Sequence, residues 1–276
     1  MFSLIDTLNY FFIGICIGSF LNVIIFRLPR KISVISPRSF CPKCKKMISW
    51  KENIPLISWL IQRGRCIGCN KEISFKYPII ELSIGILFIL FNYSSPYLYS
   101  FRNFSGFVID YFQNIFSWFF LSLLFVISLI DFRHLWIPQS LINLGFIMGA
   151  LNLFFVQIIS YSYNSSLFIE CSLACFCSYI IFEIIRISAK YFYKKDALGK
   201  GDSKLVSLIA LWLGPLGVVL SICITYIFAA ICLLVALKLK LIKKDQLIPF
   251  APFLSLGGLS VWFFGNQILI QNIFRY

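Results

Sequence analysis

Four cysteines stand at a spacing that can bind a metal ion. They form C-P-K-C at Cys41 and Cys44 and C-I-G-C at Cys66 and Cys69, with 21 residues between the two pairs. Each C-x-x-C places two sulfurs on one side of a tight turn, and four thiolates suit tetrahedral zinc. Because four thiolates leave no open coordination position, the sequence predicts a structural zinc ion.

Other states of these cysteines are weaker interpretations. Disulfides conflict with a reducing cytoplasm, which is where the charge pattern places the loop 27–77. This loop is poor in apolar side chains and needs a crosslink to fold, which four free thiols would not supply. The remaining six cysteines lie within apolar segments, where they are predicted to be small packing residues.

Two aspartates mark the ends of apolar segments. Asp131 closes one in I-D-F-R-H-L-W-I-P, and Asp202 opens another in L-G-K-G-D-S-K-L. Carboxylates at one membrane depth can share a proton, so that one takes a proton from water while the other hydrogen-bonds a scissile carbonyl. Gly199 and Gly201 permit backbone geometry that brings Asp202 close to a substrate strand. The pattern indicates an aspartic hydrolase.

The same aspartates have alternative interpretations. Asp131 pairs with Arg133 in one of them, and Asp202 caps a helix N-terminus. An ion-coupled carrier would use both carboxylates to bind a cation, although coupling sites usually lie near the bilayer midplane. A non-enzymatic assembly factor that docks partners through the cysteine loop would need neither carboxylate.

Composition fixes the class of protein. The 276 residues are 59% hydrophobic and 13% charged, with a net charge of +14. Soluble domains carry about 25% charged residues, and disordered chains are far less apolar, so the sequence predicts a polytopic membrane protein. Twelve Lys and Arg face two acids within 27–77. The positive-inside rule places this loop in the cytoplasm, near anionic lipid, and nucleic-acid binding is not expected.

An all-α architecture of about eight transmembrane helices follows, with both termini outside. Residues 205–237 carry no charge, and one helix of that length would span about 50 Å, against a hydrocarbon core of ~30 Å. Gly214-Pro215 offers a break, so two helices are predicted there. The expected spans are 7–26, 78–91, 111–130, 136–158, 167–187, 203–213, 216–237 and 247–270. The predicted domains are a first helix (1–26), a zinc-ribbon-like loop (27–77) and a transmembrane domain (78–276).

Taken together, these motifs resemble those of bacterial prepilin peptidases, the type IV leader peptidases of the GxGD aspartic protease group. The similarity runs nearly end to end. The stretches that carry it are 18–29, 39–44, 53–58, 63–69, 77–81, Asp131 with Pro138, 198–205 and 248–254. Two departures are visible: Gln139 stands where many relatives carry an acid, and Ala251 where glycine is common.

The resemblance implies a bifunctional enzyme of the bacterial cytoplasmic membrane. Asp131 and Asp202 would cleave the basic leader of prepilins and pseudopilins after a glycine, and S-adenosylmethionine would then methylate the new N-terminus. By the same resemblance, Asn22, Arg27 and Glu81 are candidate methyl-transfer residues. A basic leader and a basic loop repel each other unless anionic lipid or the few acids intervene. The pilus or secretion system that it serves and the oligomeric state stay open.

Overall fold

The structure is a computed structural model that describes residues 4–93, 107–159, 165–194, 199–241, 248–265 and 269. The segments 92–110 and 159–166, which join expected spans on the predicted outer side, lie mostly outside these residues, as does part of the segment between the fifth and sixth expected spans. The chain forms two compact units, Met1–Tyr93 and Ser94–Tyr276. In the described part the regular elements are helices, together with two isolated β-bridges, which confirms the predicted all-α class.

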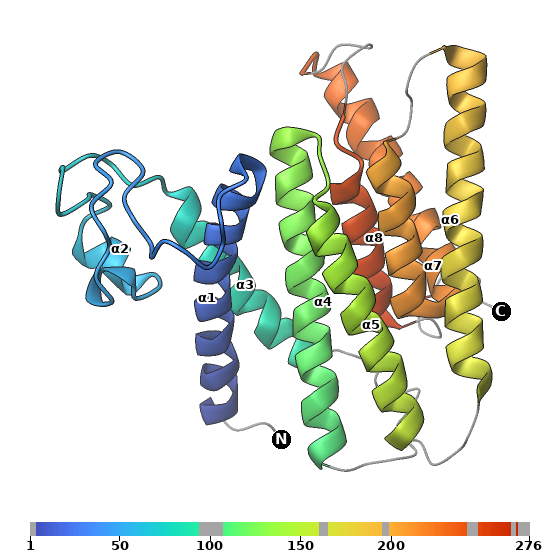
Figure 1. Ribbon diagram of the computed structural model, residues 1–276, viewed down its shortest axis with the longest axis horizontal. Coiled ribbons are helices and arrows are strands. Elements are labelled where there is room, and N and C mark those ends of the chain that lie inside the picture. Colours follow the sequence, from blue (N-terminus) through green and yellow to red (C-terminus); the bar gives the residue numbers. More distant parts are fainter. Residues whose placement is uncertain are drawn as a thin grey trace. The chain divides into compact units, whose positions relative to one another are not determined.

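The first unit is a helix pair that carries the cysteine loop. It comprises α1 (Leu4–Arg27), η1 (Leu28–Arg30), η2 (Lys51–Asn53), α2 (Ile57–Ile61) and α3 (Lys76–Tyr93) (Figure 1). Small residues let α1 and α3 approach closely. A Cβ atom at Gly14 would lie 2.7 Å from the Cα of Gly85, and one at Gly18 would lie 2.8 Å from the Cα of Glu81. This crossing places Glu81 against α1.

The second unit is a bundle of longer helices. It comprises α4 (Phe107–His134), α5 (Gln139–Ile159), α6 (Ser165–Tyr193), α7 (Lys200–Lys238) and α8 (Ala251–Phe264). Its core contains Phe120, Trp212 and Trp262, with Phe120 and Trp212 stacked at 4.7 Å between ring centroids. The Trp212 indole donates to the Gly145 carbonyl at 3.1 Å, and the Trp262 indole donates to Ser117 Oγ at 3.1 Å. These bonds satisfy polar groups that lipid would leave unpaired.

Helix α7 doubles back on itself. Gly214 has non-helical φ and ψ angles of 71° and −175°, and Pro215 follows it. The adjacent residues Gly257 and Gly258 of α8 face Thr225 and Ile209, respectively. In a straight helix, 16 residues would separate those two contacts by about 24 Å. Both ends of α7 lie toward the same end of the unit (Figure 1), as the predicted break requires.

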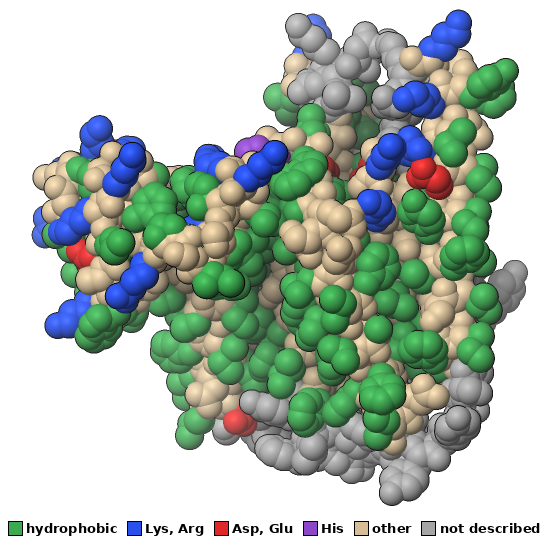
Figure 2. All heavy atoms as spheres, in the orientation of Figure 1, with side chains coloured by type: hydrophobic (Ala, Val, Ile, Leu, Met, Phe, Trp, Pro, Cys, Tyr) green, Lys and Arg blue, Asp and Glu red, His purple; other side chains and the backbone are tan. Residues whose placement is uncertain are grey.

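Counting α7 as two helices gives an element for each of the eight predicted spans. Among the residues that the structure describes, five helices are long and apolar enough to cross a membrane: α1, α4, α5, α6 and α7. Helix α8 is shorter, with 14 residues, and α3 has 18. Hydrophobic side chains cover the sides of the helices, and Lys and Arg gather at one end of the second unit and over the loop of the first (Figure 2). This is the surface of an integral membrane protein.

Candidate active site and metal centre

The four predicted cysteine ligands converge in the first unit. Their sulfur atoms all lie within 4.8 Å of one another. Cys41 and Cys69 are 4.0 Å apart, and so are Cys44 and Cys66, so each close pair joins one motif to the other. Zinc–sulfur bonds of about 2.3 Å give a tetrahedron with edges of about 3.8 Å. The donor set therefore fits a four-thiolate metal site.

The two C-x-x-C motifs fold in the same way. The Cys41 N–H donates to the Lys46 carbonyl at 2.9 Å, and the Cys66 N–H donates to the Lys71 carbonyl at 3.0 Å. A positive φ angle, 58° and 54°, recurs at the fourth residue after each leading cysteine, Lys45 and Asn70. An isolated antiparallel bridge closes each turn. The sequence spacing thus encodes two matching turns that aim their thiols at one point.

The thiols differ in acidity because they crowd one another. Burial raises the pKa of Cys41, but backbone N–H groups of Cys44 and Lys43 and the neighbouring thiols outweigh it and lower that pKa to about 7. The pKa of Cys44 is raised to about 11: its backbone hydrogen bond lowers it, while desolvation and the neighbouring thiols raise it more. Without a cation the Cys41 thiol therefore ionises more readily than the Cys44 thiol, whereas metal binding favours the thiolate form of a ligand.

Asp131 lies in the last turn of α4, and a backbone amide fixes its side chain. The carboxylate is 6% exposed, and its Oδ2 accepts a hydrogen bond from the Ala251 N–H at 3.1 Å. Ala251 is the first residue of α8, so Asp131 sits at the positive end of that helix dipole. No ion pair joins Asp131 to Arg133 in the described part of the chain.

Asp202 lies in the first turn of α7 and caps its own helix. Its Oδ2 accepts a hydrogen bond from the Gly199 N–H at 3.1 Å, and the residue is 8% exposed. The predicted capping interaction therefore exists, with Gly199 at the N-cap and Asp202 three residues later. Asp202 also interacts electrostatically with Asp131. The C-terminal end of α4 and the starts of α7 and α8 lie toward one end of the unit, so the helix ends that carry the two aspartates are at the same end (Figure 1).

The glycines beside Asp202 have separate steric roles. A Cβ atom at Gly199 would lie 3.1 Å from Asp202 Oδ2 and crowd the carboxylate. A Cβ atom at Gly201 would lie 3.0 Å from side-chain atoms of Ile137, in the segment that joins α4 to α5. Gly201 therefore allows the start of α7 to approach the segment that follows Asp131.

Two contacts at this site were not predicted. One is the Ala251 amide on Asp131, which joins residues 120 positions apart. The other is a hydrogen bond from Lys204 Nζ to Gln139 Oε1, which ties the first turn of α5 to that of α7. Gln139 and Ala251 are the two departures from the family pattern, which marks their positions but not the partners that they contact. A neutral amide at 139 still accepts the lysine hydrogen bond.

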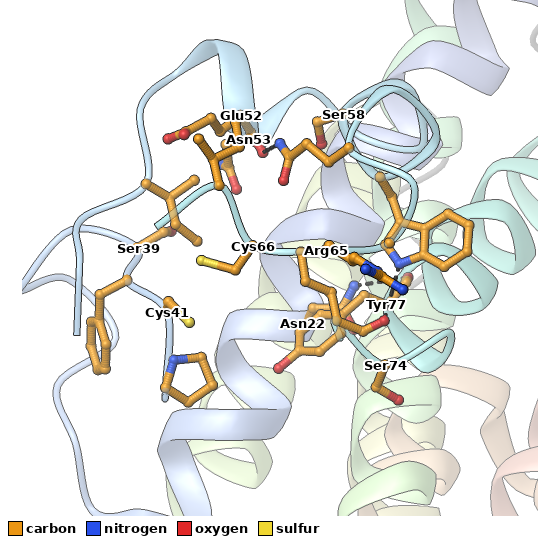
Figure 3. A pocket seen from close by; sticks show the side chains of 18 of the residues that line it. Asn22, Ser39, Cys41, Glu52, Asn53, Ser58, Arg65, Cys66, Ser74 and Tyr77 are labelled. Atoms are coloured by element: carbon orange, nitrogen blue, oxygen red, sulfur yellow. Dashed lines mark hydrogen bonds between the residues drawn. The ribbon is translucent and has the colours of Figure 1, made fainter. Parts of the chain in front are cut away.

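A cavity of about 860 Å³ lies between the cysteine loop and the helix pair. Asn22, Arg27 and Glu81 all line it, so the three candidate methyl-transfer residues are brought together. Figure 3 shows Asn22 of α1 with Tyr77, the cysteines Cys41 and Cys66, and Glu52, Asn53 and Ser58 from the segment around η2 and α2. The cavity has an aromatic component as well: Phe26, Phe40, Trp59, Phe75 and Tyr77.

Each of the three candidates is buried and bonded to the backbone. Arg27 donates to the carbonyls of Ser33 and Val34 from Nη1 and to that of Arg38 from Nη2, at 3.0 to 3.3 Å. Asn22 Nδ2 donates to the Tyr77 carbonyl at 3.2 Å. Glu81 Oε2 accepts from the Leu56 N–H at 2.8 Å. These side chains therefore hold the loop to the helices, whatever else they do.

Known protein families match residues in both units. Residues 12–95 match the Bacterial Peptidase A24 N-terminal domain, and residues 118–234 match the Type IV leader peptidase family. The first match includes α3, which sequence analysis grouped with the transmembrane domain. The boundary between the loop (27–77) and the transmembrane domain (78–276) stays a prediction.

Named relatives agree with these matches. A "Prepilin leader peptidase/N-methyltransferase" of Legionella pneumophila is 32% identical, over 93% of this chain and 90% of the relative. A "Type 4 prepilin-like proteins leader peptide-processing enzyme" of Escherichia coli O78:H11 is 32% identical, with 90% of each covered. In a Myxococcus xanthus relative the match, also 32% identical, spans 58% of that longer protein. No solved structure matches the chain. The chain belongs to the type IV leader peptidase family.

Proposed function

We propose that this protein is a membrane aspartic endopeptidase that removes the leader of type IV prepilins and pseudopilins and then N-methylates the new N-terminus. One observation carries the peptidase activity. Asp131 of α4 and Asp202 of α7 are 71 positions apart in the sequence but interact electrostatically. The Oδ2 atom of each accepts a hydrogen bond from one backbone N–H. Family membership and the printed names of the relatives support the substrate class.

The arrangement supports general acid–base hydrolysis. The ionised carboxylate takes a proton from a water molecule, whose oxygen then bonds to the scissile carbonyl carbon. The protonated partner donates a hydrogen bond to the carbonyl oxygen, and a proton reaches the nitrogen as the C–N bond breaks. With each Oδ2 fixed by an amide, the Oδ1 atoms have no hydrogen-bond partner within the described residues. They are the atoms that this mechanism uses.

The charge pattern supports a site at the cytoplasmic face of the bacterial inner membrane. Arg133, Lys200 and Lys204 flank the two aspartates in sequence, and Lys238 and Lys240 follow the returning half of α7. Cationic residues of short loops favour the cytoplasm and anionic headgroups. The leader of a prepilin lies on that side, before its hydrophobic helix.

Zinc fits the cysteine cluster of the first unit. Cys41, Cys44, Cys66 and Cys69 would hold it, and the ion would supply the positive charge that keeps four adjacent thiolates ionised. Its role is structural, because it crosslinks two turns of a loop that has no other covalent staple among the described residues.

Methyl transfer is the proposed activity of the first unit. S-adenosylmethionine would supply an electrophilic methyl group to the free amine of the cleaved substrate. The cavity beside the cysteine loop has the size of a small-molecule site and combines aromatic walls with polar side chains. Its residues would orient the donor and exclude water, and Asn22 and Arg27 would keep the walls in place.

A cleavage assay in membranes tests the proposal. A peptide with a basic leader, a glycine and a hydrophobic stretch is incubated with wild type, Asp131→Asn and Asp202→Asn, and products are read by mass. Wild type alone should cleave, and S-adenosylmethionine should add one methyl group to the product. Asp6→Asn, in the first turn of α1, serves as a matched control and should cleave normally. Cleavage that persists in both active-site variants would exclude the two-aspartate mechanism.

A further inference from the structure

Glu81 is a buried acid on the cavity wall. It is 8% exposed and lines the cavity beside the cysteine loop. The loop 27–77 carries twelve Lys and Arg, yet no ion pair to Glu81 exists in the part of the chain that the structure describes. Burial of a carboxylate is costly unless an opposite charge or several hydrogen bonds compensate it. A ligand with a positive charge at this wall of the cavity would therefore stabilise the buried carboxylate.

The fold holds this carboxylate in place from two sides. Gly18 lets α1 approach the Glu81 backbone, where a Cβ atom would lie only 2.8 Å away. On the loop side, Glu81 Oε2 accepts the Leu56 N–H at 2.8 Å. Leu56 has φ and ψ angles of 61° and −51°, a conformation that a leucine rarely adopts, so the loop is bent to make this contact. The result is an oriented carboxylate at a cavity wall.

We propose that Glu81 recognises the positive charge of the methyl donor, the sulfonium of S-adenosylmethionine. This inference rests on the methyl-transfer half of the proposed function and assigns the donor's site within it. The aromatic side chains Trp59, Phe40 and Tyr77 line the same cavity and offer flat apolar surface to an adenine ring. Lys46 and Arg65 also line it and suit the carboxylate of the donor's amino-acid group.

The cavity offers both signs of charge, because six Lys and Arg and three Glu line it, and Glu81 is the buried one of the three acids. The methyl donor carries both signs as well. S-adenosylhomocysteine is the matched probe, because it lacks only the methyl group and the sulfonium charge. A charge-recognition role therefore appears as the difference in affinity between these two compounds.

The test measures binding of both compounds to the full-length protein in detergent, without peptide, by calorimetry. Glu81→Gln removes the charge, and its amide oxygen still accepts the Leu56 N–H. We expect affinity for S-adenosylmethionine to fall at least about tenfold, while that for S-adenosylhomocysteine changes less than about threefold. The control is Glu170→Gln. Glu170 is an exposed acid of α6 that does not line the cavity, so both affinities should stay near wild type.

Three results overturn the inference. Unchanged affinities in Glu81→Gln would show that its charge is not used, and an equal loss for both compounds would show that Glu81 acts only by holding the loop. A wild type that cleaves leaders but binds neither compound would overturn the inference together with the methyl-transfer proposal, and would leave the peptidase intact. Metal content equal to that of wild type verifies that each variant is folded at the loop.

Discussion

At the scale of single residues, backbone amides rather than side chains hold the functional carboxylates. Asp131, Asp202 and Glu81 each use one oxygen to accept a main-chain N–H, from Ala251, Gly199 and Leu56. An amide donor carries no charge, so it orients a carboxylate without neutralising it. Asp131 and Asp202 therefore each keep a second oxygen for a ligand or a proton, whereas Glu81 also takes part in a hydrogen bond with the Ser19 side chain.

Arg27 provides a test at this scale. It is 4% exposed, binds three loop carbonyls, and lies 5.5 Å from the Phe40 ring centroid. Arg27→Ala would remove the donor that these three carbonyls share. Ser33 and Arg38 are exposed, so water replaces part of the loss and the local cost is about 1 to 2 kcal/mol. Hydrogen exchange in residues 33–41 should accelerate accordingly. Arg30→Ala, one turn later and exposed, should leave that exchange unchanged. Equal protection of residues 33–41 from exchange in both variants would contradict this role of Arg27 in holding the loop.

At the scale of elements, the proposed active site depends on how closely α7 approaches the segment between α4 and α5. Gly201 lies against Ile137, and Lys204 donates a hydrogen bond to Gln139 at the start of α5. These two contacts, on either side of Asp202, set the position of its helix relative to the segment that follows Asp131.

Gly201→Ala should therefore slow cleavage without unfolding the protein. The added methyl group would meet Ile137 at 3.0 Å and displace the start of α7, and a shift of about 1 Å can cost about a hundredfold in rate. Trimming the obstacle with Ile137→Ala should restore part of the lost kcat. Gly258→Ala is the control, because its Cβ atom would have ordinary contacts of at least 3.4 Å with Ile209. A Gly201→Ala enzyme with wild-type kcat would contradict this account.

At the scale of the molecule, the two compact units carry separate candidate sites: the thiol cluster and the cavity in the first, and the two carboxylates in the second. Replacement of Cys41 and Cys66 by serine should remove metal and abolish methylation, while leader cleavage falls much less. Metal analysis of wild type should give about one zinc per chain. Cys223→Ser, an exposed cysteine of α7, should change neither metal content nor methylation. Unaltered metal content in the double serine variant would rule out the four-thiolate site.

Sequence alone predicted the features that depend on local spacing. The C-x-x-C pairs predicted the thiol cluster, and the length of the uncharged run with Gly214-Pro215 predicted the reversal of α7. It did not predict contacts to the backbone of distant segments. The Ala251 amide has no side-chain signature, and the carbonyls that hold Arg27 belong to residues of any type. Their pairing arises only when helices far apart in the chain pack together.

The central claim is that Asp131 and Asp202 act as one catalytic unit, and a double-mutant cycle on kcat/KM for leader cleavage tests it most directly. Each asparagine variant should lose about a thousandfold or more, and Asp131→Asn/Asp202→Asn should lose no more than the worse single variant, because either loss already disables the pair. Losses that multiply in the double variant, or a single variant that cleaves at the wild-type rate, would contradict the shared mechanism.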